Sequence, residues 1–163
     1  MMLQGKVHKF GDDINTDYII SGKRKFDTLD MKFLTQYLME DIRPGFYKEI
    51  SEGDFIVGGS NFGCGSSREY APTLIKTAGI SAVLAKSFAR IFFRNSMNIG
   101  LPLIECDTDG IDQGDHLEVQ LSNGVIMNKT KGTKIVAKLI PDLPTQILRS
   151  GGLIKFYKAK GLL

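Results

Sequence analysis

The residues best suited to chemistry in this sequence form a glycine-rich stretch, Gly63-Cys64-Gly65-Ser66-Ser67-Arg68. The glycines permit backbone angles that other residues avoid, and they let a ligand approach the main chain. Ser66 and Ser67 offer neutral hydrogen-bond donors, and Arg68 offers a planar fork that suits a carboxylate. A helix that starts just after the stretch would add free N–H groups and a dipole that favour an anion. The stretch therefore indicates recognition of a small molecule that carries carboxylates.

The same stretch fits other motifs poorly. A dinucleotide-binding fingerprint needs a third glycine where this chain has Arg68, and the Gly-Lys-Ser/Thr of a Walker loop is missing. The Gly-x-Ser-x-Gly frame of a hydrolase elbow does not surround Ser66 or Ser67. Cys64 would need a histidine partner to act as a nucleophile, and both histidines of the chain stand in strand-like stretches. Simple helix capping by the serines is the alternative to a binding site.

The elements that must position this stretch can be read on either side of it. Residues 54–59 read as a short buried strand that leads into the stretch. A helix follows, with apolar residues at positions i, i+3, i+4 and i+7 counted from Ala71. Pro72 cannot donate a backbone hydrogen bond, so it belongs in the first turn of that helix. The serines are therefore expected at the helix start or just before it.

Strands and helices continue to alternate along the chain. Residues 82–85 and 101–106 read as buried strands on either side of a helix over residues 88–98. We expect Ser87 to cap this helix and Gly100 to end it. This alternation favours an α/β core with right-handed crossovers.

Segments outside this core add further strands and helices. Three stretches between residues 116 and 139 alternate between apolar and polar side chains, like strands joined by tight turns. Residues 5–10 alternate in the same way near the start of the chain. Residues 30–39 have helical character, and Asp30 is suited to cap them. We expect one mixed domain over residues 1–163.

Composition and charge argue against several classes of protein. Two cysteines and two histidines are too few for a disulfide framework or for a metal site on this chain, which takes about three or four ligands. The net charge is only +3 and the basic residues form no long run, so no nucleic-acid partner is expected. No apolar stretch reaches the roughly 18 residues that span a bilayer, and the start lacks the apolar run of a signal peptide. The sequence predicts a cytoplasmic protein without a membrane partner.

Three ordered motifs resemble those of a known family. Residues 61–69 resemble the signature of the small subunit of 3-isopropylmalate dehydratase, which is shared by the swivelling fourth domain of aconitase. Residues 85–92 and 98–102 are similar to the next block of the family, and residues 11–17 are similar to its opening motif. The resemblance covers nearly the whole chain. It implies an α/β fold, the three-layer β/β/α swivelling domain of the aconitase C-terminal type.

The resemblance also implies an activity and a partner. The chain would be one subunit of a hydro-lyase that dehydrates and rehydrates a hydroxy-dicarboxylate in leucine biosynthesis. Ser66 would be the base, and Ser67 and Arg68 would bind substrate carboxylates. A separate large subunit would carry a [4Fe-4S] cluster as the Lewis acid for the leaving hydroxyl. The shortage of cysteines in this chain agrees with a cluster held elsewhere.

Two departures from the family leave the substrate's side group open. Tyr70 stands where the family often has histidine, which puts a proton relay there in doubt. Residues 21–27 replace a Tyr-Leu-Arg-Thr-like specificity segment of relatives. In this segment Lys23 or Arg24 would meet a carboxylate and Phe26 an alkyl group, or the whole segment is a solvated basic loop. Homoaconitate, citraconate and 2,3-dimethylmalate chemistry are alternatives to isopropylmalate, and so is a non-catalytic anion-binding module.

Two further arginines, Arg90 and Arg94, lie four residues apart on one face of the helix predicted over residues 88–98. They would either dock the large subunit or face water. The same helix carries more apolar residues than a narrow stripe needs, and most of these are explained by core packing.

Overall fold

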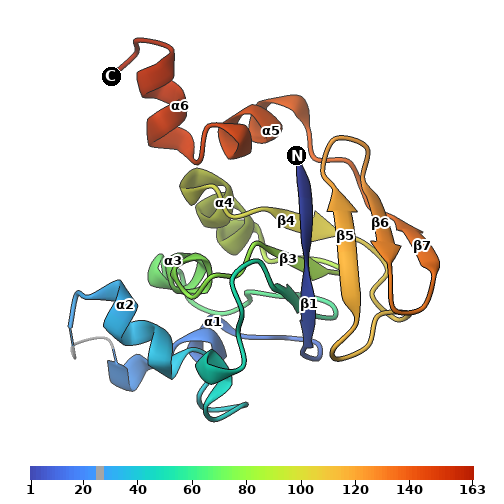
Figure 1. The fold of residues 1–163 in the computed structure, drawn as a ribbon. Coiled ribbons are helices and arrows are strands. Elements are labelled where there is room, and N and C mark those ends of the chain that lie inside the picture. The colour runs from blue at the N-terminus through green and yellow to red at the C-terminus, as the bar shows by residue number, and fades with distance from the viewer. Residues whose placement is uncertain (25–27) are drawn as a thin grey trace.

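The computed structural model describes residues 1–24 and 28–163, with a seven-stranded sheet at its centre in the order β4-β3-β2-β1-β5-β6-β7 (Figure 1). One half of the sheet is parallel and consists of β1 (Met2–Lys9), β2 (Phe55–Val57), β3 (Ala82–Ala85) and β4 (Leu103–Glu105). The other half pairs antiparallel to β1 and consists of β5 (His116–Gln120), β6 (Val125–Asn128) and β7 (Thr133–Val136). The strands expected from the sequence are all present, with ends that differ by a few residues.

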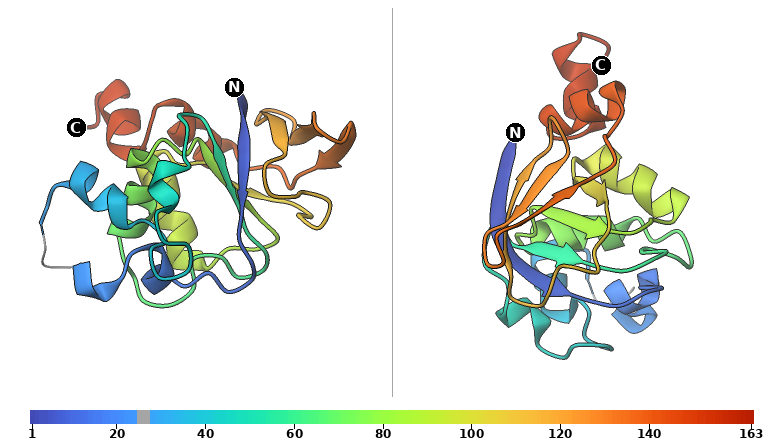
Figure 2. Two further views of the ribbon diagram at one scale, coloured as in Figure 1. Left: turned by 60° about the horizontal axis from the view of Figure 1, so that its bottom comes forward. Right: turned by 90° about the vertical axis from the view of Figure 1, so that its right-hand side faces the viewer.

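The helices lie mainly beside the parallel half, and α5 and α6 stand at one end of the molecule (Figure 2). The α-helices are α1 (Thr16–Ile19), α2 (Met31–Leu34), α3 (Tyr70–Thr77), α4 (Arg90–Ile99), α5 (Asp142–Arg149) and α6 (Leu153–Ala159). Short 3-10 turns are η1 (Gly22–Arg24), η2 (Thr35–Tyr37) and η3 (Phe46–Lys48). Among the residues described, no helix combines the length and the apolar character that crossing a membrane requires.

Successive side chains of the parallel strands belong alternately to two hydrophobic cores. Ile56 and Val83 belong to the cluster on the helix side. Their neighbours Phe55 and Val57 belong to a second cluster, which includes Leu117 and other residues of the antiparallel half. The sheet therefore curls so that its antiparallel half packs on the face opposite the helices. This arrangement confirms the predicted three-layer β/β/α fold.

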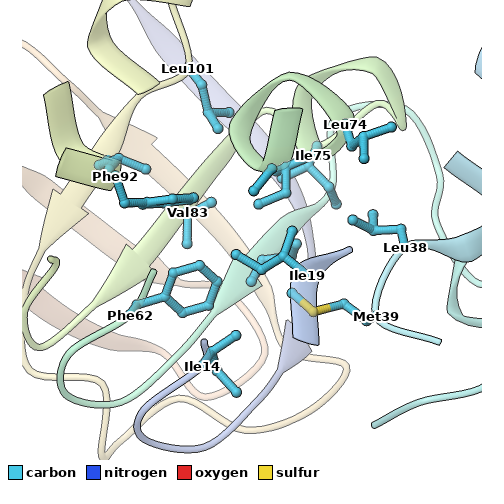
Figure 3. Packing of buried hydrophobic residues seen from close by; sticks show 14 of the residues in the cluster. Ile14, Ile19, Leu38, Met39, Phe62, Leu74, Ile75, Val83, Phe92 and Leu101 are labelled. Carbon is cyan, nitrogen blue, oxygen red and sulfur yellow. The ribbon is translucent and has the colours of Figure 1, made fainter. Parts of the chain in front are cut away.

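The helix-side core anchors the glycine-rich turn. Figure 3 shows Phe62, which precedes the glycines, among the buried residues of this core, with Val83 and Phe92 beside it. The Phe62 ring centroid lies 5.6 Å from that of Phe92 and 6.1 Å from that of Phe88. Because Phe62 is fully buried, the residues that follow it are tied to a rigid part of the molecule.

One predicted helix start is wrong. Helix α4 begins at Arg90 with Ala89 as N-cap, and no side chain caps it. The Ser87 hydroxyl instead accepts a hydrogen bond of 2.8 Å from the N–H of Asn61. The predicted cap at Asp30 is confirmed, since its carboxylate accepts hydrogen bonds from the first N–H groups of α2. The helix predicted over residues 30–39 is instead α2 followed by η2, and Met39, which is fully buried with a positive φ of 57°, lies beyond its end.

Candidate active site

The glycine-rich turn connects β2 to α3 and is held against the loop that precedes α1. The N–H of Gly63 donates to the carbonyl of Ile14 at 2.8 Å. The N–H of Thr16 donates to the carbonyl of Cys64, also at 2.8 Å. The Thr16 hydroxyl donates to the carbonyl of Ser66 at 2.9 Å. These bonds fix the main chain that carries the serines.

Two glycines of the turn occupy positions that no other residue fits. Gly63 has a φ of +81°, and a Cβ there would lie 2.2 Å from the Phe92 ring. Gly65 has a φ of +97°, and a Cβ there would lie 2.4 Å from Oδ1 of Asn15. Both the positive φ and the close approach therefore require glycine. The sequence alone indicates that these glycines belong to a turn, and the packing shows why glycine is needed at both positions.

The three motifs noted in the sequence meet at this turn. The side-chain amide of Asn61 donates to Asp13 of the opening motif at 2.9 Å. The N–H of Phe62 donates to the carbonyl of Ser87 at 3.0 Å, and the N–H of Ala89 donates back to the Phe62 carbonyl at 2.9 Å. Segments that are far apart in the sequence thus form one continuous support for the turn.

Ser66, Ser67 and Arg68 stand between two hollows in the surface. The larger hollow has a volume of about 340 Å³ and the smaller a volume of about 250 Å³. All three residues line both hollows. Ser66 and Ser67 are exposed and Arg68 is half-buried. The structure therefore presents these three consecutive residues at an open surface.

The side chain of Arg68 is held from two sides. Its guanidinium forms an ion pair with Asp17, which lies in α1. It also packs on the backbone of Gly22, where an added Cβ would lie 3.2 Å from the nearest guanidinium nitrogen. The buried Nε of Arg68 has no hydrogen-bond partner among the described residues. The arginine is thus positioned at the hollow, and its charge is shared with Asp17.

The two other cations expected at the site lie in different environments. Arg24 lines the larger hollow, but its guanidinium makes hydrogen bonds of 2.9 and 3.1 Å to Glu40 and lies 3.8 Å from the ring centroid of Tyr37. Lys23 is exposed on η1 and is not one of the described residues that line either hollow. Phe26, the residue expected to meet an alkyl group, lies outside the described residues.

Comparison with known proteins identifies the family. Residues 43–108 match the aconitase C-terminal domain. The chain is 52% identical over 161 residues to 3-isopropylmalate dehydratase small subunit 2 of Archaeoglobus fulgidus, covering 99% of this chain and 98% of that protein. The chain belongs to the family of 3-isopropylmalate dehydratase small subunits. It is also 54% identical over 158 residues to the small subunit of Wolinella succinogenes, covering 96% of this chain and 94% of that protein.

A solved structure shares the fold of this family member. The crystal structure of a 3-isopropylmalate dehydratase from Methanocaldococcus jannaschii superimposes with a TM-score of 0.95 at 46% sequence identity. The match covers 99% of this chain and 96% of that one. The family resemblance inferred from the three sequence motifs is thereby confirmed.

The two cysteine thiols of this chain do not ionise readily, as a nucleophilic thiol must. Burial raises the pKa of Cys64, and the nearby carboxylate of Asp13 raises it further. Burial together with Asp107 raises the pKa of Cys106 to about 12. No group of three or more His, Cys, Asp or Glu side chains among the described residues could hold a metal ion. Two thiols are fewer than the three or four cysteine ligands that an iron–sulfur cluster usually takes.

The structure adds apolar residues to the site that the sequence did not single out. Ile20, Leu29, Met31 and Leu34 line the larger hollow opposite the serines. Leu29 is 82% exposed, which is unusual for a leucine in the wall of a hollow. In the sequence, Leu29 is marked only by its place directly before the helix cap Asp30, and this pattern is too common to assign a function.

Proposed function

We propose that this chain is the small subunit of a 3-isopropylmalate dehydratase, a hydro-lyase that acts with a large subunit in the cytoplasm. The enzyme interconverts 2-isopropylmalate and 3-isopropylmalate in leucine biosynthesis by removing and re-adding water. Family membership supports this function. The observation that carries it is the row of two exposed serines, Ser66 and Ser67, and the half-buried Arg68 on a rigid turn between two hollows.

Ser66 is the proposed base. A serine hydroxyl is normally too weak an acid to lose its proton near neutral pH. Arg68 and the free N–H groups at the start of α3 both favour the anionic form of a nearby group. In dehydration, the proton of the carbon next to a carboxylate moves to Ser66 Oγ, the C–H electrons form the double bond, and the hydroxide leaves. In the rehydration that forms the isomer, hydroxide adds to the carbon that lost the proton, and Ser66 gives the proton to the carbon that lost the hydroxide.

Ser67 and Arg68 are the proposed ligands of the substrate carboxylates. The hydroxyl of Ser67 is exposed next to the base, and the Arg68 guanidinium is held in place by Asp17 and Gly22. A planar guanidinium binds a carboxylate through two parallel hydrogen bonds, so it fixes the orientation of the acid as well as its position. A bound substrate carboxylate would either share the Arg68 guanidinium with Asp17 or displace Asp17 from it.

The walls of the larger hollow favour isopropylmalate over the alternative substrates. Their apolar residues suit a branched alkyl group, whereas homoaconitate carries a third carboxylate in the same place. Arg24 stands in this wall, but it already forms an ion pair with Glu40. Citraconate and 2,3-dimethylmalate carry only methyl groups, which would fill less of the hollow. Arg68 is also paired, but it lines both hollows beside the serines. Arg24 lines only one hollow and is held on the Tyr37 ring, and Lys23 is not among the described residues that line either. Lys23 and Arg24 are therefore weaker candidates for substrate binding.

The proposed reaction requires a partner chain. Ser66 and Ser67 face an open surface, so a second subunit must cover them to exclude water from the reaction. We expect the [4Fe-4S] cluster of the enzyme on that large subunit, because two thiols are too few to hold it and the described residues offer no group of three or more metal ligands. The contribution proposed for this chain is the base, the carboxylate ligands and the apolar wall.

The Ser66→Ala variant tests this function in the reconstituted complex. Turnover of 2-isopropylmalate, followed by alkene absorbance, is expected to fall at least about 1,000-fold while the subunits still assemble. Ser67→Ala is the matched control, and it should mainly raise KM. Near-normal turnover by Ser66→Ala would overturn the assignment of the base. Tight binding of substrate by the isolated chain, with no turnover in the wild-type mixture, would favour an anion-binding module instead.

A further inference from the structure

We propose that the outward face of α4 is a docking surface for the large subunit, and that Arg90 and Arg94 meet carboxylates of that partner there. The docking face is defined here as Arg90, Ile91, Arg94 and Asn95. The proposal rests on the proposed function, since it takes the partner to be the subunit that completes the site over Ser66.

The helical repeat of α4 separates this face from the core. Phe92, Ser96 and Met97 are buried against the sheet. Arg90, Ile91 and Arg94 are exposed on the other side, one turn apart. Ile91 is 46% exposed, although it is a large apolar residue between two cations. An exposed apolar residue with charged residues beside it is typical of a surface that a partner covers.

The charge of this face is not balanced within the described part of the chain. Arg24, Arg43 and Arg68 each form an ion pair with a carboxylate, but Arg90 and Arg94 form none with any described residue. The first turn of α4 contains no acidic residue, and no side chain caps its N-terminus. The positive end of the helix dipole therefore adds to the two guanidinium charges. A partner that fits this face presents carboxylates.

The docking face is continuous with the proposed active site. Arg90, Ile91 and Asn95 line the smaller hollow together with Ser66 and Ser67. A subunit that closes over these serines must therefore come into contact with the N-terminal half of α4. The partner contact and the substrate contact share one surface, which explains how assembly can complete the site.

A third hollow extends this surface on the other flank of α4. It has a volume of about 510 Å³, and Arg90 lines it as well as the smaller hollow. Its walls come from α4 and the segment before it, from β4, and from residues 138–144, and they are mainly apolar, with Phe88, Phe93, Leu139, Pro141 and Pro144. Arg90 thus stands on a ridge between two hollows. A ridge with hollows on both sides offers the shape complementarity that a stable subunit contact needs.

A double charge reversal tests the docking face in the full complex. Arg90→Glu with Arg94→Glu is compared with Lys129→Glu and Lys134→Glu, which makes the same change of charge on the exposed edge of the antiparallel half. Affinity for the purified large subunit is measured by sedimentation over a range of salt concentrations, without substrate. The arginine variant is expected to bind at least about tenfold more weakly and to lose most of the salt dependence, whereas the lysine variant binds like wild type.

Three outcomes would overturn the proposal. The arginine variant could bind the large subunit as tightly as wild type, or both double variants could lose affinity equally through net charge alone. Unchanged assembly with a raised KM would make these arginines substrate ligands rather than docking residues. The failure of the proposed function is seen separately, as wild-type subunits that assemble but do not turn over 2-isopropylmalate in a parallel activity assay.

Discussion

The larger hollow has two walls that are built in different ways. The glycine-rich turn forms one wall, and its backbone is bonded to the loop before α1 and to the segment before α4. Residues 20–24 and 28–34 contribute the facing wall through short helical turns. In the described part of that wall the main-chain hydrogen bonds are local, such as those from Arg24 to Ser21 and from Leu34 to Asp30.

This difference separates chemistry from selectivity. A wall tied to two distant segments keeps the serines and Arg68 in one geometry, which a proton transfer requires. A wall made of local turns and exposed apolar side chains can change its sequence at little cost to the fold. We infer that the reaction belongs to the first wall and the choice of side group to the second, and the following variants test that division.

The largest effect on the fold is expected from Gly63→Ala in the rigid wall. The new Cβ would meet the buried ring of Phe92 at 2.2 Å on a backbone with a φ of +81°. The clash and the backbone strain together are expected to lower the free energy of unfolding by about 3 kcal/mol. Thermal unfolding measures this as a Tm lower by about 10 °C.

Gly114→Ala is the control that separates strain from clash. Its φ is +85°, close to that of Gly63, but an added Cβ would meet nothing within 4 Å. This variant should lose only about 1 kcal/mol, the cost of the backbone angle. Equal losses in the two variants would show that the contact with Phe92 does not hold the turn.

The next effect is expected from Leu29→Ala in the facing wall. Leu29 is 82% exposed, so the fold should keep its Tm. The apolar contact with the substrate's side group would be lost, which costs about 1.5 kcal/mol and raises KM for 2-isopropylmalate about tenfold. Steady-state kinetics of the reconstituted enzyme measures this change. Leu163→Ala, a leucine 75% exposed near the C-terminus, should leave KM unchanged.

A different result with Leu29→Ala would break the comparison between the walls. If kcat fell and KM stayed constant, Leu29 would support the reacting groups rather than the side group. If the Tm fell as much as in Gly63→Ala, the facing wall would be as essential to the fold as the glycine-rich turn.

A smaller effect is expected from Arg24→Ala. Arg24 joins Glu40 in a partly exposed ion pair and lies on the Tyr37 ring, contacts that together contribute about 1 kcal/mol to the facing wall. Chemical denaturation should show this loss, and Glu40→Gln should show a similar one. Turnover should stay within about threefold of wild type in both variants. A loss of more than about 100-fold in Arg24→Ala alone would instead make Arg24 a ligand of a substrate carboxylate.

The sequence predicts the parts of this molecule that depend on local pattern. The strand that ends at Val57, the turn and the helix from Tyr70 to Thr77 follow from apolar periodicity and from glycine, and so the serines were placed correctly. Contacts between distant residues were not predictable. Ser87 was expected to cap a helix but accepts from Asn61, and nothing near Arg24 in the sequence indicates its pairing with Glu40.

The smallest effect is expected from Cys64→Ser, although Cys64 stands between the two glycines that the rigid wall needs. Burial and the nearby Asp13 carboxylate raise its pKa, so the thiol is protonated near neutral pH and is a poor nucleophile. Serine is close to cysteine in size, and the carbonyl of residue 64 still accepts from Thr16. Turnover should therefore stay within about twofold of wild type, and a thiol reagent at pH 7 should modify the folded chain far more slowly than the unfolded one. Inactivation by Cys64→Ser would give the thiol a part in the reaction, and the proton transfer could then no longer be ascribed to Ser66 alone.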